Sequence, residues 1–556
     1  MAAGSTGVAV SAPADVGLKR EIGLIGATWA SETSIIGSGW LFGSLYAAQA
    51  VGGAAILAWA IAGVIVAVLA LVHAELGAMY PVAGGTARFP HMAFGSVAGV
   101  GFGFFAYVQA VTIAPIEAFA FMTYGSYFWH GIYNTKTGNV TTAGFIFTII
   151  LMAFMVAVNF LAMRLFSRVN SAITWWKVAI PILAIIVLLF KFKSGNFTAG
   201  GGGFMPGGIK ALFGAIPGAG IVFAYSGFEQ ADQLAGEIKD PQRNLPRAII
   251  MAVGIAVVIY MLLQVVFIGA MPTDLLGKGF AGLTNPTVIA GPFAGLATLV
   301  GLGWLAFVLR VDAFISPTGT GLIYMTGTSR VSYGLSRNRY LPPIFARTND
   351  NGVPWVSLIT AFIVGLFFLL PFPSWHSLVG LITGASVLMY AGAPLSMGAF
   401  RRQVPDADRP YRMPGAAILC PAAFAVADLL IYWSGFEVVW KLGIVLVIGY
   451  VILGITMSFD KQRPRLNWKS AQWIPVWLIG MGIISWQGVY SGQGSKTPLP
   501  PVNTGHLHFW IAMLVVVVFS VAIYYWAMAS RLPREEMLRL VSAQSEIEDP
   551  MADIHE

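Results

Sequence analysis

Apolar residues fill most of this chain in long stretches that short polar segments separate. A helix that crosses the hydrocarbon core of a bilayer needs about 20 mostly apolar residues. The pattern therefore predicts an all-α membrane protein with about fourteen transmembrane helices. We expect these spans at residues 22–48, 53–79, 95–129, 143–162, 172–192, 211–236, 247–271, 292–328, 355–371, 375–399, 416–434, 437–458, 473–490 and 509–530.

The first and sixth spans each contain a cluster of small residues near the middle. Gly37-Ser38-Gly39 interrupts the first, and Ser226-Gly227, between Tyr225 and Phe228, interrupts the sixth. Unwound backbone at membrane depth survives only where it lines a cavity, and interruptions at corresponding positions of two halves point to a substrate site at the midplane. Free N–H groups can hold a carboxylate there, and free C=O groups an ammonium. The pattern thus favours a site for a zwitterion, the alternative being glycines that only allow close helix packing.

The two interrupted spans divide the chain into expected units. These are a cytoplasmic tail at 1–20, a first five-helix half at 21–192, a second with its preceding loop at 193–400, four additional transmembrane helices at 401–530, and a cytoplasmic tail at 531–556.

The composition agrees with a chain that mostly avoids water. Of its 556 residues, 57% are hydrophobic and 10% are charged, whereas soluble domains carry roughly 25% charged residues. The net charge of +8 does not indicate nucleic acid, because Lys and Arg lie in short clusters between apolar stretches. Cys420 is the only cysteine, so neither an intrachain disulfide nor a thiolate metal site is expected. Residues 1–18 lack the pattern of a cleavable signal peptide.

The distribution of positive charge predicts the orientation. With fourteen spans and a cytoplasmic N-terminus, 23 of the 32 Lys and Arg residues fall in cytoplasmic segments. This bias is the one that orients multi-pass proteins, so we expect a cell-membrane protein with both termini in the cytoplasm. Lys177 and Arg310 fall within spans, and the lysines expected outside are Lys136, Lys191, Lys193, Lys210, Lys278, Lys441 and Lys496.

Several motifs carry a resemblance to a known family. They are Gly37-Ser38-Gly39; Gly52-Gly53, Trp59, Glu75-Leu76-Gly77 and Pro81-Val82-Ala83-Gly84-Gly85; Phe223 to Phe228; Gly236 to Pro241 with Arg243 to Pro246; and Thr328-Ser329-Arg330 with Leu341-Pro342 and Gly352-Val353-Pro354. Together they resemble the amino acid–polyamine–organocation superfamily. Ser38 to Phe42, Asp312 to Pro317 and Pro371 to Trp375 are most similar to its bacterial aspartate–proton symporter branch.

The resemblance implies a LeuT-like core of two inverted five-helix repeats with discontinuous helices 1 and 6, and transport by alternating access. It implies that the substrate carboxylate binds the first interruption and that the α-ammonium binds carbonyls of both interruptions. The substrate-binding residues expected on this basis are Ile36, Gly37, Ser38, Gly39, Phe223, Ala224, Tyr225, Ser226 and Gly227.

Lys177 lies inside the fifth span, where a charge costs about 2.5–3.5 kcal/mol or more. The resemblance implies that a lysine at this position takes part in proton coupling. We expect Lys177 to gain and lose a proton against first-helix carbonyls and the hydroxyls of Ser316 and Thr318, unless it is a permanently charged structural residue. Glu117 in the third span also fits the aspartate–proton branch and is a second proton-coupling candidate.

Arg310 in the eighth span has two open interpretations. It could bind a substrate side-chain carboxylate as a bidentate fork, or it could pair with Glu117 or Glu229. The acidic residues argue the other way, because an unpaired Glu117, Glu229 or Asp232 in the pocket would favour a cationic substrate. Asp312 in the eighth span is a further intramembrane carboxylate.

No ATP-binding loop, zinc-binding helix motif, Cys/His cluster or nucleophile elbow occurs in the sequence. We therefore expect no enzyme activity, no metal and no cofactor. The leading hypothesis is a proton-coupled amino acid symporter, with aspartate or another acidic amino acid preferred. Alternatives are a cationic amino acid or polyamine transporter or exchanger, and an amino-acid sensor without flux. The expected partners are the amino acid, protons and membrane lipid, with no nucleic acid and no obligate protein partner evident.

Overall fold

The computed structural model describes residues 22–81, 85–161, 163–235, 238–349, 353–370, 374–459, 464–491 and 506–547. The predicted tail at 1–20 lies outside these residues, as do the motif positions 82–84, 236–237, 352 and 371–373 and the end of the tail predicted at 531–556.

Within the described residues, twelve helices of fifteen or more residues make up the body of the protein. They are α3 (Ala55–Met79), α5 (Ser96–Gly125), α6 (Thr142–Leu161), α7 (Met163–Leu189), α11 (Pro241–Gly269), α15 (Gly303–Arg337), α16 (Trp355–Leu369), α17 (Trp375–Gln403), α18 (Ala416–Ser434), α19 (Phe436–Phe459), α21 (Trp473–Gln487) and α22 (Phe509–Ser530).

Shorter helices lie at the interruptions and at the two ends of the body. They are α1 (Leu24–Ile35), α2 (Gly39–Val51), α4 (Gly85–Phe94), α8 (Gly208–Gly218), α9 (Ile221–Tyr225), α10 (Gln230–Gln233), α12 (Thr273–Leu276), α13 (Pro286–Ile289), α14 (Pro292–Leu299), α20 (Trp468–Ala471) and α23 (Arg534–Ile547), with the 3₁₀ turns η1 (Gly52–Ala54), η2 (Ser194–Thr198), η4 (Phe280–Gly282) and η5 (Pro343–Ala346). In the described residues the only sheet is an antiparallel hairpin of β1 (Tyr133–Asn134) and β2 (Asn139–Val140), with Tyr133 opposite Val140.

The helices are those of a membrane protein. Within the described residues, nine helical segments are long and apolar enough to cross a bilayer. Five of the predicted spans are not among the nine. The first and sixth are interrupted, and the fifth, ninth and thirteenth contain shorter apolar helices, Ile173–Leu189, Trp355–Leu369 and α21. The eighth span, predicted at 292–328, is displaced, because the chain turns at Gly301 with a positive φ of 79° before α15 begins.

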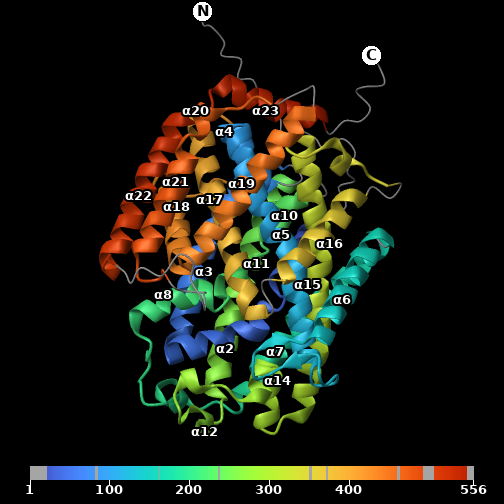
Figure 1. The fold of residues 1–556 in the computed structure, drawn as a ribbon, viewed down its shortest axis with the longest axis vertical. Coiled ribbons are helices and arrows are strands. Elements are labelled where there is room, and N and C mark those ends of the chain that lie inside the picture. The colour runs from blue at the N-terminus through green and yellow to red at the C-terminus, as the bar shows by residue number, and fades with distance from the viewer. Residues whose placement is uncertain are drawn as a thin grey trace, which may run out of the picture.

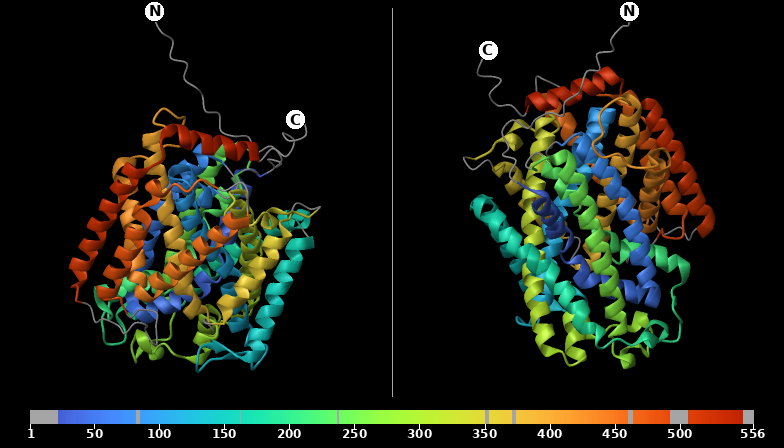
Figure 2. Two further views of the ribbon diagram at one scale, coloured as in Figure 1. Left: turned by 45° about the horizontal axis from the view of Figure 1, so that its top comes forward. Right: turned by 180° about the vertical axis from the view of Figure 1, so that it is seen from behind.

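The long helices pack side by side in a bundle (Figure 1). α5 packs along α15, and α3 packs along α11. α18, α21 and α22 form one flank, α6 and α16 lie on the opposite flank, and α19 crosses the face between them (Figures 1 and 2). One end carries α4, α20 and α23, and the other carries α2, α8, α12 and α14 (Figure 1). α2 and α8 therefore lie at the end of the bundle opposite α23.

The outer faces of the peripheral helices are apolar and exposed. On α6 these side chains include Ile146, Ile150 and Phe154, and on α19 they include Val447 and Val451. Continuous apolar surface of this kind is unfavourable in water, but it is the surface that lipid requires.

Two tertiary contacts join segments that are distant in sequence. Glu75 of α3 accepts hydrogen bonds from Arg401 Nε (2.9 Å) and from the backbone N–H of Met413 (2.7 Å), which ties α3 to the segment that leads into α18. Ile22, just before α1, pairs with Ile238, just after α10, in a parallel bridge, and Lys239 N donates to Ile22 O at 2.8 Å. The two interrupted regions are thus linked at one end.

Candidate functional site

The first interruption separates α1 from α2, as predicted. Ile36 leaves the helix with φ −81° and ψ 79°, and α2 begins at Gly39. The backbone N–H of Ser38 donates to Oε2 of Glu117 at 2.9 Å, instead of to a helical carbonyl. Because a Cβ at Gly39 would stand 2.6 Å from the Cα of Ala224, only glycine lets the two interrupted regions approach this closely.

The second interruption divides the predicted sixth span into three short helices. Gly220 is left-handed between α8 and α9, and residues 226–229 form a turn between α9 and α10. Gly227 has a φ of 120°, and a Cβ there would meet the backbone of Ser34 and Ile35 at 2.8 Å. The turn therefore packs directly against the end of α1.

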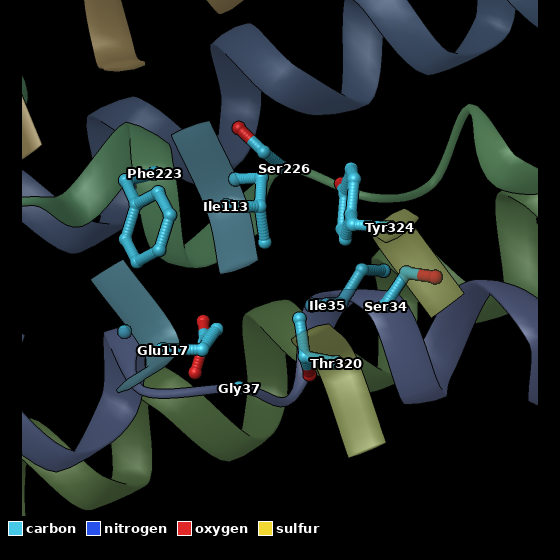
Figure 3. A pocket seen from close by; sticks show the side chains of 10 residues that line it. Ser34, Ile35, Gly37, Ile113, Glu117, Phe223, Ser226, Thr320 and Tyr324 are labelled. Carbon is cyan, nitrogen blue, oxygen red and sulfur yellow. The ribbon is translucent and has the colours of Figure 1, made fainter. Parts of the chain in front are cut away.

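A small cavity lies between the two interruptions (Figure 3). Its volume for the centres of water-sized spheres is about 10 Å³, roughly the room for one water molecule. An amino acid needs more space, so this is a conformation closed around the site. The residues that line it are Ser34, Ile35, Gly37, Gly39, Ile113, Glu117, Phe223, Ser226, Thr320 and Tyr324.

The cavity brings together part of the predicted substrate-binding set. Gly37, Gly39, Phe223 and Ser226 line it. The rest of the set, apart from Arg310, belongs to the two interruptions without lining the cavity, and these residues are Ile36, Ser38, Ala224, Tyr225 and Gly227.

Glu117 of α5 supplies the carboxylate nearest to the first interruption. Its side chain is 1% exposed, Oε2 accepts from Ser38, and Oε1 has no hydrogen-bond partner among the described residues. A Cβ at Gly37 would lie 2.6 Å from Oε1. Figure 3 shows the Glu117 side chain pointing into the space between Gly37 and Ser226. A carboxylate therefore occupies the amide at which a substrate carboxylate was expected.

Lys177 of α7 joins three helices at the end of α1. Its Nζ is fully buried and donates to the carbonyl of Thr33 at 2.6 Å and to Oγ1 of Thr320 at 2.7 Å. Thr320 of α15 in turn donates to Thr33 O at 2.9 Å. The expected first-helix carbonyl is therefore present, but the hydroxyl that accepts from Lys177 belongs to Thr320.

These contacts correct the prediction that the hydroxyls of Ser316 and Thr318 lie beside Lys177. Ser316 Oγ donates to Oδ1 of Asp312 at 2.7 Å, and Thr318 Oγ1 has no hydrogen-bond partner among the described residues. Residues four apart share one face of a helix, whereas Thr318 points to the opposite side. The lysine therefore meets the correct face of α15, one turn further along than predicted.

Arg310 does not reach the cavity and pairs with neither Glu117 nor Glu229. It donates to Oγ1 of Thr298 at 3.1 Å, and its guanidinium lies 3.6 Å from the ring centroid of Tyr127. Ten residues of helix separate it from Thr320, a rise of about 15 Å. In this conformation Arg310 therefore forms neither of the two predicted ion pairs, and its binding of a substrate carboxylate stays a prediction.

Glu229 sits in a satisfied cluster at the second interruption. Its carboxylate accepts from Tyr390 Oη (2.7 Å), from the backbone N–H of Gly227 (2.9 Å) and, at longer range, from Tyr324 Oη (3.4 Å). Three hydrogen-bond donors offset much of the cost of burying a carboxylate. Glu229 therefore does not act as a free negative charge in the cavity.

Glu32 is an intramembrane carboxylate that the sequence analysis overlooked. It lies on α1, is fully buried, and neither carboxylate oxygen has a hydrogen-bond partner among the described residues. The signal was available, since an ionisable residue inside a predicted span is a functional candidate by default. Asp232, which was singled out, is also buried without a hydrogen-bond partner among the described residues.

An aromatic layer closes the cavity on the side of α2 and the start of α17. Trp375 Nε1 donates to Ser38 Oγ at 2.7 Å. The Trp375 ring stacks on Tyr46 (centroids 5.7 Å apart, planes at 8°) and on Phe42, and it meets Phe223 edge-on at 5.8 Å. We call Phe42, Tyr46, Phe223 and Trp375 the aromatic barrier.

Comparison with known proteins gives a consistent result. The sequence model of the amino acid permease family matches residues 22–484. The chain is 35% identical over 505 residues to the aspartate-proton symporter of Bacillus subtilis (90% of this chain, 94% of the relative). It is 34% identical over 521 residues to the glutamate/serine transporter AimA of the same organism (92% and 94%), and 23% identical over 463 residues to its branched-chain amino acid permease BcaP (81% and 95%). These relatives are transporters, not enzymes.

Proposed function

This chain belongs to the amino acid permease family, and on that premise we propose that it imports an acidic amino acid together with protons across the cell membrane. The observation that carries the proposal is the backbone N–H of Ser38 holding a carboxylate, that of Glu117, at 2.9 Å. An amide of an interrupted helix that binds one carboxylate can bind another.

The proposed architecture is the one expected from the sequence. It has fourteen spans, both termini in the cytoplasm, inverted five-helix repeats at 21–192 and 193–400, and four additional helices at 401–530. The interruptions that begin these repeats, at 36–38 and 226–229, support it. Alternating access follows from rearranging the two repeats around a site that lies between them.

In the proposed substrate complex the α-carboxylate takes the place of the Glu117 carboxylate on the amides of Gly37 to Gly39. The α-ammonium is held by carbonyls near Ile36 and between Phe223 and Ser226. Two ionised carboxylates cannot share these amides without strong repulsion. Substrate binding therefore requires the Glu117 carboxylate to leave the amides or to accept a proton. This requirement couples the binding of the substrate to the binding of a proton at Glu117.

Lys177 is the second proposed coupling group. When charged, it holds the carbonyl of Thr33 and the hydroxyl of Thr320, so that α1, α7 and α15 are joined. When it loses its proton, one charge-assisted contact to α1 is weakened. We propose that this change releases α1 during the cycle.

One finding supports an acidic substrate, and one observation in the cavity favours an alternative. The chain is similar along nearly its whole length to proteins named as an aspartate-proton symporter and a glutamate/serine transporter. The cavity also exposes free oxygen Oε1 of Glu117, which favours a second candidate, a cationic amino acid or polyamine. Competition of labelled uptake by aspartate on one hand and by arginine or putrescine on the other separates the two.

The test is uptake into proteoliposomes with an imposed pH gradient, screened across amino acids. We expect accumulation of aspartate or glutamate driven by an acidic outside, and its loss when a protonophore collapses the gradient. Uptake that ignores the gradient would refute the coupling, and failure of every acidic amino acid to compete would refute the substrate class.

A further inference from the structure

A second and larger cavity is lined in part by α2 and α8. These two helices lie at the end of the molecule opposite α23 (Figure 1). The volume of this cavity is about 1170 Å³. Its walls come from α2, the β1–β2 hairpin, α8, and the first turns of α17 and α19. We call this cavity the vestibule. It is separate from the small cavity between the interruptions, and none of the substrate-binding residues proposed above lines it.

The charged side chains that line the vestibule are mostly positive. They are Lys136, Lys210, Lys441 and Glu437. Glu437 is paired with Lys441, Oε1 to Nζ, at 2.7 Å. Among the described residues no carboxylate forms an ion pair with Lys136 or Lys210. The vestibule therefore carries two positive charges that no carboxylate of the described residues balances by an ion pair.

The backbones that carry these two lysines are fixed. Lys136 lies in the turn of the hairpin, and its N–H donates to Oδ1 of Asn134 at 2.9 Å. The carbonyl of Lys210, on α8, accepts from Oη of Tyr490 at 2.6 Å. Both side chains are exposed. Each is a long flexible chain on an anchored base, so the ammonium groups can follow a ligand within the vestibule.

The aromatic barrier lies between the vestibule and the small cavity. Tyr46 lines the vestibule, and Phe223 lines the small cavity. Trp375 contacts both rings. A solute in the vestibule is thus one aromatic layer away from the interrupted helices.

We propose that the vestibule is an antechamber site for anionic amino acids, in which Lys136 and Lys210 hold the side-chain carboxylate before the aromatic barrier opens. A cleft lined by one sign of charge between low-dielectric walls concentrates ligands of the opposite sign. A dicarboxylic amino acid has a net charge of −1 and gains from this field, whereas a neutral one does not. This proposal rests on the proposed function and adds a site that selects amino acids by the charge of their side chain.

The expected size follows from Coulomb's law. At about 8 Å in a water-like medium, each unit charge changes the local concentration of a monovalent anion about twofold. Removing both charges, in K136Q/K210Q, should therefore raise KM for aspartate about four- to sixfold at low ionic strength and leave kcat unchanged. The difference should vanish in 0.5 M salt, where screening acts over only a few ångströms.

A labelling experiment tests the field without relying on transport. Gly380 lines the vestibule, and a Cβ there meets no atom within 4 Å, while the native Cys420 is buried. In Gly380→Cys protein, we compare the rates of reaction with an anionic and a cationic methanethiosulfonate reagent. Adding K136Q/K210Q should lower the anion-to-cation rate ratio about 15- to 35-fold at low ionic strength, because the two charges change each rate about four- to sixfold in opposite directions.

The matched control is K191Q/K193Q, which removes two exposed lysines that do not line the vestibule. It should change neither the labelling ratio nor KM. A ratio that K136Q/K210Q leaves unaltered, or a KM that rises equally in both double variants, overturns the inference. If the unmodified protein takes up no acidic amino acid, the proposed function fails, and the labelling ratio still decides whether the vestibule attracts anions.

Discussion

Replacing Glu117 by glutamine tests whether the protein's own carboxylate competes with the substrate. Glu117→Gln keeps the size of the side chain and an oxygen able to accept from Ser38 N, but it removes the charge. It therefore imitates the protonated glutamate. We expect the variant to bind aspartate more tightly than the unmodified protein at high pH, and with little dependence on pH.

The magnitude follows from the contact that is weakened. A hydrogen bond to a charged group contributes about 1.5–3 kcal/mol, and one between neutral groups about 0.5–1.5 kcal/mol. The side chain at position 117 thus binds the Ser38 amide about 1–1.5 kcal/mol more weakly in the variant, which corresponds to roughly five- to tenfold tighter substrate binding. In the unmodified protein, binding should strengthen as pH falls, because protonation of Glu117 removes the same charge.

The assay is equilibrium binding of labelled aspartate to purified protein at pH 5.5 and pH 8.5. Asp428→Asn is the matched control, since Asp428 is also a buried carboxylate, but it lies on α18, where Trp477 Nε1 donates to it at 2.9 Å. The control should keep the pH dependence of the unmodified protein. If Glu117→Gln also keeps it, Glu117 does not compete for the amide and the coupling scheme is wrong.

Three further predictions follow from individual contacts. Lys177→Met should reduce proton-driven uptake at least tenfold, and uptake at normal rates with an imposed pH gradient would exclude this lysine from coupling. Gly39→Ala should cost about 1–3 kcal/mol because its Cβ would stand 2.6 Å from the Cα of Ala224; a thermal unfolding scan should show a lower Tm than for Gly254→Ala, whose Cβ meets nothing within 4 Å. Arg310→Gln should leave KM for the substrate within about twofold, since about 15 Å of helix separates it from the cavity, and a larger rise in uptake assays would restore it to the site.

The backbone features of the site were predictable because they depend on local residue types. Glycines at 37, 39 and 227 mark positions where the chain leaves the helix or where two segments touch, and those constraints act on the residue itself. Long apolar stretches likewise predict helices that face lipid. Both signals are present in a single sequence without knowledge of its partners.

The side-chain partners were harder to predict because they depend on how each helix is rotated and shifted. The hydroxyl beside Lys177 was misplaced by one turn of α15, from Ser316 to Thr320. The eighth span was predicted to begin at 292, but α15 begins at Gly303. This error shifted the predicted position of Arg310 along the helix axis toward the cavity. The hydrogen bond from Ser38 to Glu117 joins residues 79 positions apart, and no local pattern specifies it.

The parallel bridge between Ile22 and Ile238 constrains how the interrupted regions can move. It joins the beginning of α1 to the segment after α10, and Ser31 Oγ of α1 also donates to the carbonyl of Phe228 at 3.1 Å. Because these two contacts lie at different points along α1, we expect α1 and α10 to move together as one rigid unit. An exit path at this end would then open by a concerted rotation of both helices. A disulfide that joins positions 22 and 238 would therefore not prevent this rotation.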